Sequence, residues 1–154
     1  MILLNHIEKG GIYYELEGSS PKDALASLIS ALPPQKNVSP AGLLHAVLER
    51  ETLMPTAIGD GIAIPHPRNP LILNQDEEFI AMGFLKNPQN WNSLDGIPVD
   101  TLFLIVSSSA KSHLGILSRI SFLCQDEEFR NILKNRPPAS VILGSIKSIE
   151  ENWK

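Results

Sequence analysis

Apolar residues recur at helical spacing in two segments near the start of the chain. Each segment follows a serine-proline pair, Ser20-Pro21 or Ser39-Pro40. Serine caps a helix and proline fits its first position, so each proline is predicted to begin a helix. The first is predicted to end at Pro33-Pro34, and the second to carry Arg50 and Glu51 at its C-terminal end. Their apolar faces comprise Leu25, Leu28, Ile29 and Leu32, and Leu43, Leu44, Val47 and Leu48.

The middle of the chain has a different pattern. Residues 79–85 and 102–106 are almost continuously apolar, which predicts two strands, the second buried on both faces. Turns are predicted between them at Asn87-Pro88 and Asp95-Gly96. Helical spacing returns near Ser112, where the apolar positions are Leu114, Leu117, Ile120, Leu123 and Cys124. Shorter helices are predicted around Phe129, Ile132 and Leu133 and around Val141, Ile142, Ile146 and Ile149.

Helices on both sides of a small mixed sheet predict the α/β class, with a three-layer α/β/α sandwich. The 154 residues suffice for one hydrophobic core, so residues 1–154 are predicted to form a single domain. The lone cysteine, Cys124, rules out a disulfide within the chain and fits a reducing compartment and a place in a helix core.

Composition narrows the function. The net charge is −4, and the 13 lysines and arginines form no cluster, which argues against nucleic-acid binding and would suit a basic protein partner. No apolar run approaches the roughly 20 residues that cross a bilayer, so we expect no direct membrane insertion. The first residues lack a basic region followed by a long apolar stretch, so we expect no secretory signal and a cytoplasmic protein.

The clearest candidate for chemistry is His66, which stands between Pro65 and Pro67 after an apolar segment. Proline fixes its own backbone and restricts the residue before it, so His66 is predicted to lie at a rigid strand end or loop edge. Gly59 and Gly61 allow a tight turn before the strand, and backbone N–H groups of such a turn can approach an anion such as phosphate.

A neutral imidazole is a nucleophile that can carry a phosphoryl group, and His66 is the predicted carrier. Phosphoryl transfer needs positioned hydrogen-bond donors, which Arg50, Thr56 and His113 could supply. The histidines and the cysteine show no metal-ligand spacing, and no Gly-Lys-Ser/Thr nucleotide loop is present. We therefore expect no metal and no cofactor, and a donor that is another phosphoprotein.

The residues of this segment resemble the active-site signature of enzyme IIA proteins of the bacterial phosphoenolpyruvate-dependent phosphotransferase system, of the fructose, mannitol and nitrogen-regulatory class. The matching residues are Arg50-Glu51, Thr56, Ile58-Gly59-Asp60-Gly61, Ala63-Ile64-Pro65-His66, Asp95-Gly96-Ile97-Pro98-Val99 and His113-Leu114-Gly115-Ile116-Leu117. The resemblance implies the same sandwich fold. It also implies that Arg50 and His113 contact the phosphoryl group and that Glu51 orients Arg50 or His113.

The resemblance further implies that the small histidine phosphocarrier protein phosphorylates His66, which passes the group to a cysteine of a IIB component during sugar uptake. We expect a freestanding carrier without an attached IIB, IIC or donor domain. That expectation leaves a second interpretation open: a nitrogen-regulatory type of protein whose phosphorylation state controls binding to a regulatory target. A third is a relative that has lost transfer, although Arg50, His66 and His113 are all retained.

Plainer interpretations exist for the single residues. Arg50-Glu51 could be a solvated pair at a helix end, His113 an ordinary helix residue, and Thr56 a brace for the turn. Arg68 could meet phosphate, a partner or only solvent; His6 and His45 match no motif, and His45 is expected to be structural. Pro67 stands where many family members have glycine or another small residue, which removes a backbone N–H beside the site and bears on the transfer rate.

Overall fold

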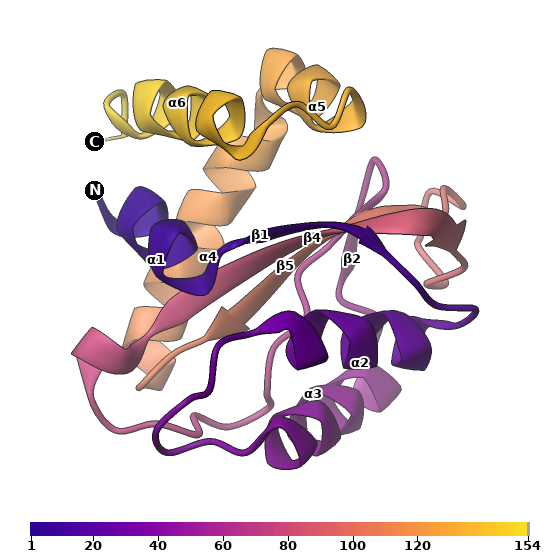
Figure 1. Ribbon diagram of the computed structural model, residues 1–154. Coiled ribbons are helices and arrows are strands. Elements are labelled where there is room, and N and C mark those ends of the chain that lie inside the picture. The colour runs from indigo at the N-terminus through magenta and orange to yellow at the C-terminus, as the bar shows by residue number, and fades with distance from the viewer. Residues whose placement is uncertain (154) are drawn as a thin grey trace.

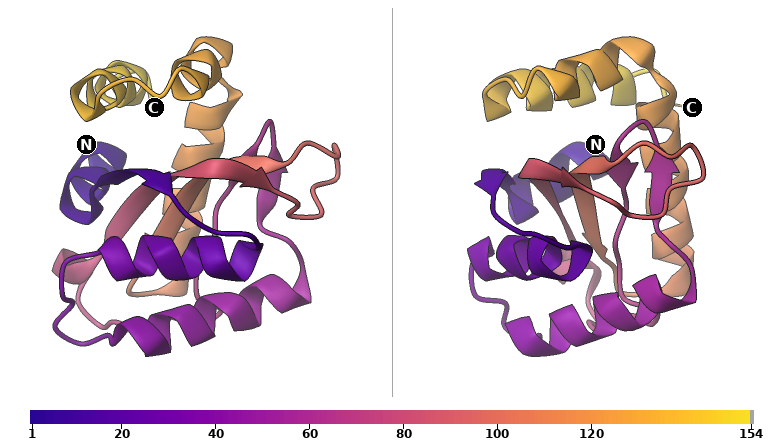
Figure 2. Two further views of the ribbon diagram at one scale, coloured as in Figure 1. Left: turned by 45° about the vertical axis from the view of Figure 1, so that its right-hand side comes forward. Right: turned by 90° about the vertical axis from the view of Figure 1, so that its right-hand side faces the viewer.

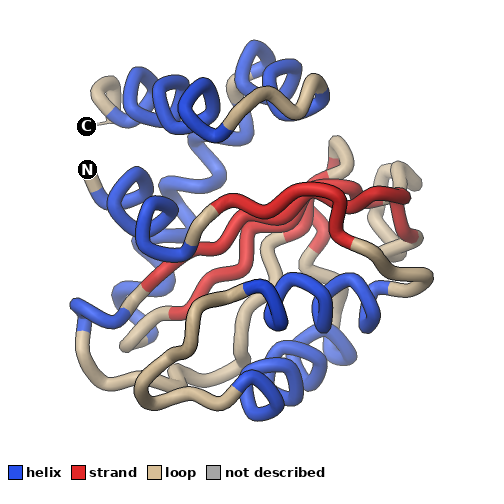
Figure 3. Tube along the Cα trace, in the orientation of Figure 1, coloured by secondary structure: helices blue, strands red, loops and turns tan. Residues whose placement is uncertain are grey.

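A five-stranded mixed sheet forms the centre of the computed structural model, which describes residues 1–153 (Figure 3). The strand order is β1-β4-β5-β3-β2. The strands are β1 (Ile12–Leu16), β2 (Ala57–Gly59), β3 (Ile62–Ala63), β4 (Phe79–Gln89) and β5 (Val99–Val106). β1 runs parallel to β4 and β3 parallel to β5, whereas β4 and β5 are antiparallel, as are β2 and β3.

Helices cover both faces of the sheet, which confirms the predicted three-layer sandwich (Figures 1 and 2). The helices α2 (Pro21–Ala31) and α3 (Pro40–Leu53) lie on one face. The other face is covered by α1 (Ile2–Gly10), α4 (Ala110–Gln125), α5 (Glu127–Lys134) and α6 (Ala139–Glu150). Successive side chains of β4 alternate between the two hydrophobic clusters, as the twofold repeat of a strand requires.

Serine side chains cap the N-termini of α2, α3 and α4, of which α3 and α4 carry predicted site residues. The hydroxyls of Ser20 and Ser39 accept the N–H groups of Asp23 and Gly42 at 3.1 and 3.0 Å, which confirms both predicted helix starts. Ser109 caps α4 in the same way by accepting the N–H of Ser112 at 3.1 Å. The helix therefore begins slightly before the predicted start near Ser112.

Several expectations were wrong in detail. Asn87-Pro88 does not form a turn but continues β4, where the pairing with β5 shifts register between Phe84 and Gln89. Leu114 was placed on the buried face of α4, yet it is 65% exposed. Leu44 and Leu48 are only half-buried, and Val141 is exposed. Neither α1 nor β1 was predicted.

The topology brings two loops together at one edge of the sheet. Because β3 and β5 are parallel neighbours, the segments that follow them leave the sheet at the same edge. The first of these segments carries His66, and the second leads through Ser107 into α4. No helix within residues 1–153 is long and apolar enough to cross a membrane.

Cys124 lies in α4 and is buried, as predicted. Burial raises the pKa of its thiol to about 12, so the sulfur stays protonated at neutral pH.

Candidate functional site

His66 lies in the loop that follows β3, and backbone hydrogen bonds hold this loop on both sides. The N–H of Ile64 donates to the carbonyl of Thr56 at 3.0 Å, and the carbonyl of Pro65 accepts the N–H of Ile105 at 3.0 Å. The His66 side chain is 8% exposed, so little of it reaches solvent. The predicted rigid position at a strand end is what the structure shows.

The two ring nitrogens of His66 have different environments. Nδ1 lies 2.7 Å from the carbonyl oxygen of Ile64. A carbonyl can only accept, so Nδ1 carries the proton and donates it, and the neutral ring keeps its lone pair on Nε2. The backbone therefore selects which nitrogen can act as a nucleophile. Sequence patterns gave no signal for this, because the partner is a main-chain atom.

His113, in the first turn of α4, faces His66. The ring centroids are 4.4 Å apart and the planes make an angle of 51°. Burial lowers the pKa of His66, and the nearby charge of Arg50 lowers it further, against the raising effects of the Ile64 hydrogen bond and of Glu51. Burial, then His66 and Arg50, lower the pKa of His113 to about 4. Both imidazoles are therefore neutral at physiological pH.

Arg50 is the nearby cation whose charge lowers the pKa of both histidines. It lies in the last turn of α3, and its Nη1 donates to the carbonyl of Met54 at 2.7 Å. That bond ties the guanidinium to the segment that leads into β2. A guanidinium has five N–H donors in a fixed fork, so one such bond is compatible with binding phosphate oxygens. The structure brings Arg50, His66 and His113 within electrostatic reach of one another.

Glu51 has a different partner from the one expected. Its carboxylate accepts the N–H of Thr56 at 3.1 Å and also the Thr56 hydroxyl. Within residues 1–153 neither Arg50 nor His113 forms an ion pair or hydrogen bond with Glu51, so no direct contact supports the expectation that Glu51 orients one of them, and that expectation stays a prediction. Glu51 instead fixes Thr56, which is 4% exposed and whose carbonyl holds the segment before His66.

The glycine turn also differs from expectation. Asp60 and Gly61 have positive φ angles of 56° and 80°, which confirms a tight turn. The N–H of Asp60, however, donates to the Asp95 carboxylate at 2.9 Å, and a Cβ at Gly59 would lie 3.1 Å from the same carboxylate. In this structure the anion at the turn is therefore an internal side chain, the Asp95 carboxylate.

A depression opens beside His113 and the loop that follows His66. It is lined by Pro67, Arg68, Asn69, Pro70, Ser107, Ala110, His113 and Leu114. These residues come from the loop after His66 and from the start of α4. Arg68 itself is exposed, and so is His45 on α3, whereas His6 bonds to Glu78 away from this depression. The site thus presents a buried neutral imidazole next to an open, partly apolar surface.

The family model described as "Phosphoenolpyruvate-dependent sugar phosphotransferase system, EIIA 2" matches residues 5–148. The chain belongs to this EIIA 2 family. Members of this family are phosphocarriers, so the family implies phosphoryl transfer. The neutral, buried His66 beside Arg50 suits that chemistry.

The relatives of this chain include nitrogen regulatory proteins and components of sugar phosphotransferase systems. A nitrogen regulatory protein of Bradyrhizobium diazoefficiens is 31% identical over 129 residues, which cover 82% of each chain. The fructose-specific EIIABC component of Bacillus subtilis is 36% identical over 104 residues, which cover 66% of this chain but 16% of that protein.

Solved structures share the fold. The nitrogen regulatory protein IIA-Ntr of Neisseria meningitidis has a TM-score of 0.83 at 24% identity, covering 95% of this chain and 99% of that one. The mannitol enzyme IIA of Escherichia coli, in a complex with phosphorylated enzyme IIB, has a TM-score of 0.69 at 16% identity, covering 89% and 94%.

Proposed function

We propose that His66 accepts a phosphoryl group at Nε2 from a phosphorylated donor protein and passes it to an acceptor protein. The histidine phosphocarrier protein is the donor, and a IIB component of a sugar uptake system is the acceptor. The observation that carries this proposal is the hydrogen bond from Nδ1 of His66 to the carbonyl of Ile64, which leaves the lone pair of a buried, neutral ring on Nε2.

In the accepting step, the Nε2 lone pair forms a bond to phosphorus while the donor's nitrogen–phosphorus bond breaks. The electron pair of the broken bond stays on the donor's imidazole. His66 keeps its Nδ1 proton, and the positive charge that develops on the ring is delocalised next to the Ile64 carbonyl dipole. Passing the group on reverses the roles: an acceptor thiolate attacks phosphorus and the Nε2 bond breaks.

The surrounding residues supply position and charge. Arg50 offers guanidinium N–H groups to the oxygens of the phosphoryl group, and a neutral His113 can donate one more hydrogen bond to them. Thr56 and Glu51 act on the loop, because their hydrogen bonds hold the segment that leads into His66. Since phosphoryl transfer depends mainly on such positioning, Arg50→Ala and His113→Ala are expected to slow transfer in a folded protein.

The test mixes the protein with phosphoenolpyruvate, enzyme I and the histidine phosphocarrier protein, and measures intact mass. Wild type is expected to gain one acid-labile phosphoryl group, and His66→Ala none. His45→Ala is the matched control, since this exposed histidine lies on the same α3 helix as Arg50, and it should be labelled like wild type. Labelling of His66→Ala to the wild-type level would contradict the proposal.

A regulatory function is the second candidate. The alignment with the nitrogen regulatory protein covers 82% of this chain, whereas the alignment with the fructose EIIABC component covers 66% of it, and this longer match supports the regulatory candidate. In that case the phosphoryl group on His66 adds roughly two negative charges at the depression and alters binding to a target.

Transfer of label from the phosphorylated protein to a IIB component supports the uptake role. A binding partner that discriminates the two phosphorylation states, without label transfer, supports regulation.

A further inference from the structure

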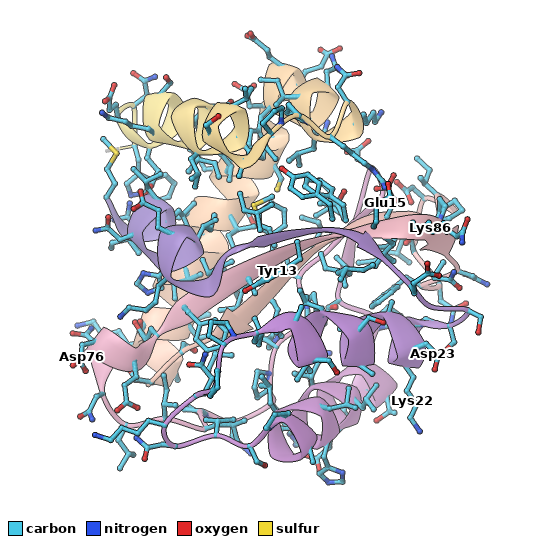
Figure 4. The ribbon with its side chains drawn as sticks, viewed as in Figure 1. Tyr13, Glu15, Lys22, Asp23, Asp76 and Lys86 are labelled. Carbon is cyan, nitrogen blue, oxygen red and sulfur yellow. The ribbon has the colours of Figure 1, made fainter. Side chains whose placement is uncertain are left out.

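Glu78 is a buried carboxylate outside the set of residues that the sequence indicated. It immediately precedes β4 and follows the short 3-10 helix Gln75–Glu77, whose Asp76 is labelled in Figure 4. Only 3% of Glu78 is exposed. Carboxylates are almost never buried to this degree unless they are paired, so its partners indicate what it does.

Most of these partners belong to the segment that leads from β5 into α4. Oε2 of Glu78 accepts the N–H of Ser108 at 2.7 Å and its hydroxyl at 2.9 Å. Oε1 accepts the hydroxyl of Ser112 at 2.9 Å and lies 3.3 Å from Nε2 of His6 on α1. One carboxylate therefore binds both the loop before α4 and the first turn of α4.

Both bound serines stand next to residues of the site. Ser108 follows Ser107, which lines the depression, and Ser112 precedes His113, whose ring faces His66. Burial raises the pKa of Glu78, but the hydrogen bonds from Ser108, Ser112 and His6 outweigh it, so the pKa lies below the usual 4.5. At neutral pH the group is a carboxylate that can accept all of these hydrogen bonds.

We propose that Glu78 is a positioning residue for phosphoryl transfer: its carboxylate holds the first turn of α4 through Ser108 and Ser112 and thereby sets His113 against His66. The inference rests on the proposed function of His66. Glu78 acts through these serines and does not touch the phosphoryl group. A displacement of about 1 Å at a reacting group can cost up to two orders of magnitude in rate, so a distant anchor of this kind has a measurable kinetic effect.

The chain contains a matched control. Glu150, at the end of α6, is 8% exposed and accepts the N–H groups of Leu3 and Leu4 at 3.0 and 2.8 Å. It too is a buried carboxylate at a helix N-terminus, but that helix is α1, which contributes His6 to the Glu78 carboxylate and carries none of the proposed transfer residues. The Glu150→Ala variant therefore measures how much the loss of any buried carboxylate at a helix N-terminus affects the protein.

The experiment compares Glu78→Ala, Glu78→Gln and Glu150→Ala in rates of phosphorylation over a range of donor concentrations. Glu78→Ala is expected to lower the saturating rate by roughly tenfold or more, with little change in the donor concentration at half saturation. Glu78→Gln should restore most of the rate. Its amide oxygen can accept from Ser108, and its amide NH₂ can donate to the Ser112 hydroxyl. Glu150→Ala should transfer at the wild-type saturating rate.

Amide hydrogen exchange at Ser112 and His113 gives a readout that needs no transfer. Exchange is expected to be faster in Glu78→Ala and unchanged in Glu150→Ala. If wild type is never phosphorylated, the proposed function fails while exchange still decides the role of Glu78. Should Glu78→Ala not fold, Ser112→Ala removes one contact and should show the same effects more weakly. An unchanged saturating rate with unchanged exchange, or equal losses in the Glu78 and Glu150 variants, would overturn the inference.

Discussion

The local backbone gives the two imidazole nitrogens of His66 different protonation states and different roles. Nδ1 donates to the Ile64 carbonyl, which fixes the ring, and Nε2 keeps the lone pair. The proline on each side and the Ile105 hydrogen bond to Pro65 hold this arrangement before any ligand arrives. Little ordering then remains for the transfer step.

The lowered pKa of His66 predicts how phosphorylation depends on pH. An imidazole attacks phosphorus only when it is neutral, and burial followed by the charge of Arg50 lowers the pKa of His66 below the usual 6.5. We expect the acceptance rate, corrected for the activity of the donor, to persist below pH 6.5 before it falls. Arg50→Gln should move that fall to higher pH. A midpoint at or above 6.5 in wild type would contradict the assignment.

The lowered pKa of His113 predicts that the stability of the protein depends on pH. Its pKa is about 4 in the folded protein against 6.5 ordinarily, so between these pH values the unfolded chain binds a proton that the folded chain does not. The free energy of unfolding therefore decreases as the pH falls from 6.5 towards 4. Urea titrations at pH 7 and 4.5 should show a smaller decrease for His113→Ala than for wild type. His45→Ala should follow wild type, and equal decreases in all three proteins would disprove the prediction.

At the scale of elements, the site depends on how α3 joins β2. Glu51 at the end of α3 binds the backbone and hydroxyl of Thr56 just before β2. In a double-mutant cycle, Glu51→Gln and Thr56→Val are expected to couple by about 1 kcal/mol in the free energy of unfolding. Thr52, whose hydroxyl donates to the Glu49 carbonyl, provides the control: Thr52→Val and Glu51→Gln should be additive within about 0.5 kcal/mol. Additive effects of Glu51→Gln and Thr56→Val would contradict the role of Glu51 in holding Thr56.

Local sequence signals predicted some elements well and others poorly. Ser20-Pro21 and Ser39-Pro40 are local cap signals, and both predicted helices begin there. The helix α1 was missed because its first N–H groups are satisfied by Glu150 from the other end of the chain, which no local pattern reveals.

The same contrast holds in the site. His66, His113 and Arg50 were found from their motif, and the structure places them together. The partners of Glu51 and Glu78 were not found, because neighbouring positions in the sequence do not show which polar groups meet after folding. A charged residue directly before a buried strand was the only signal at Glu78, and it is equally typical of a solvent-exposed strand end.

At the scale of the whole molecule, the two hydrophobic clusters pack against opposite faces of the sheet, so close contacts at those faces contribute to stability. A Cβ at Gly10, the last residue of α1, would lie 2.1 Å from the Ile80 carbonyl oxygen. Gly10→Ala is therefore expected to lower the free energy of unfolding by about 1–3 kcal/mol. In α6, a Cβ at Gly144 would meet nothing within 4 Å. Gly144→Ala should therefore raise the free energy of unfolding by about 0.5–1 kcal/mol. Similar effects of the two variants would contradict this account of the packing.

The whole molecule also explains why the proposed reaction occurs at one edge of the sheet. The parallel pair β3 and β5 directs the His66 loop and the start of α4 to that edge, and α3 adds Arg50. Together these parts are proposed to make Nε2 of His66 the atom that bears the phosphoryl group.

The most direct test is heteronuclear NMR of the phosphorylated protein labelled with ¹⁵N at histidine. The ¹⁵N shifts and the coupling to ³¹P identify which nitrogen of which ring bears phosphorus. We predict coupling at Nε2 of His66, with Nδ1 still protonated against the Ile64 carbonyl. Phosphorus on Nδ1 of His66, or on His6, His45 or His113, would contradict the account.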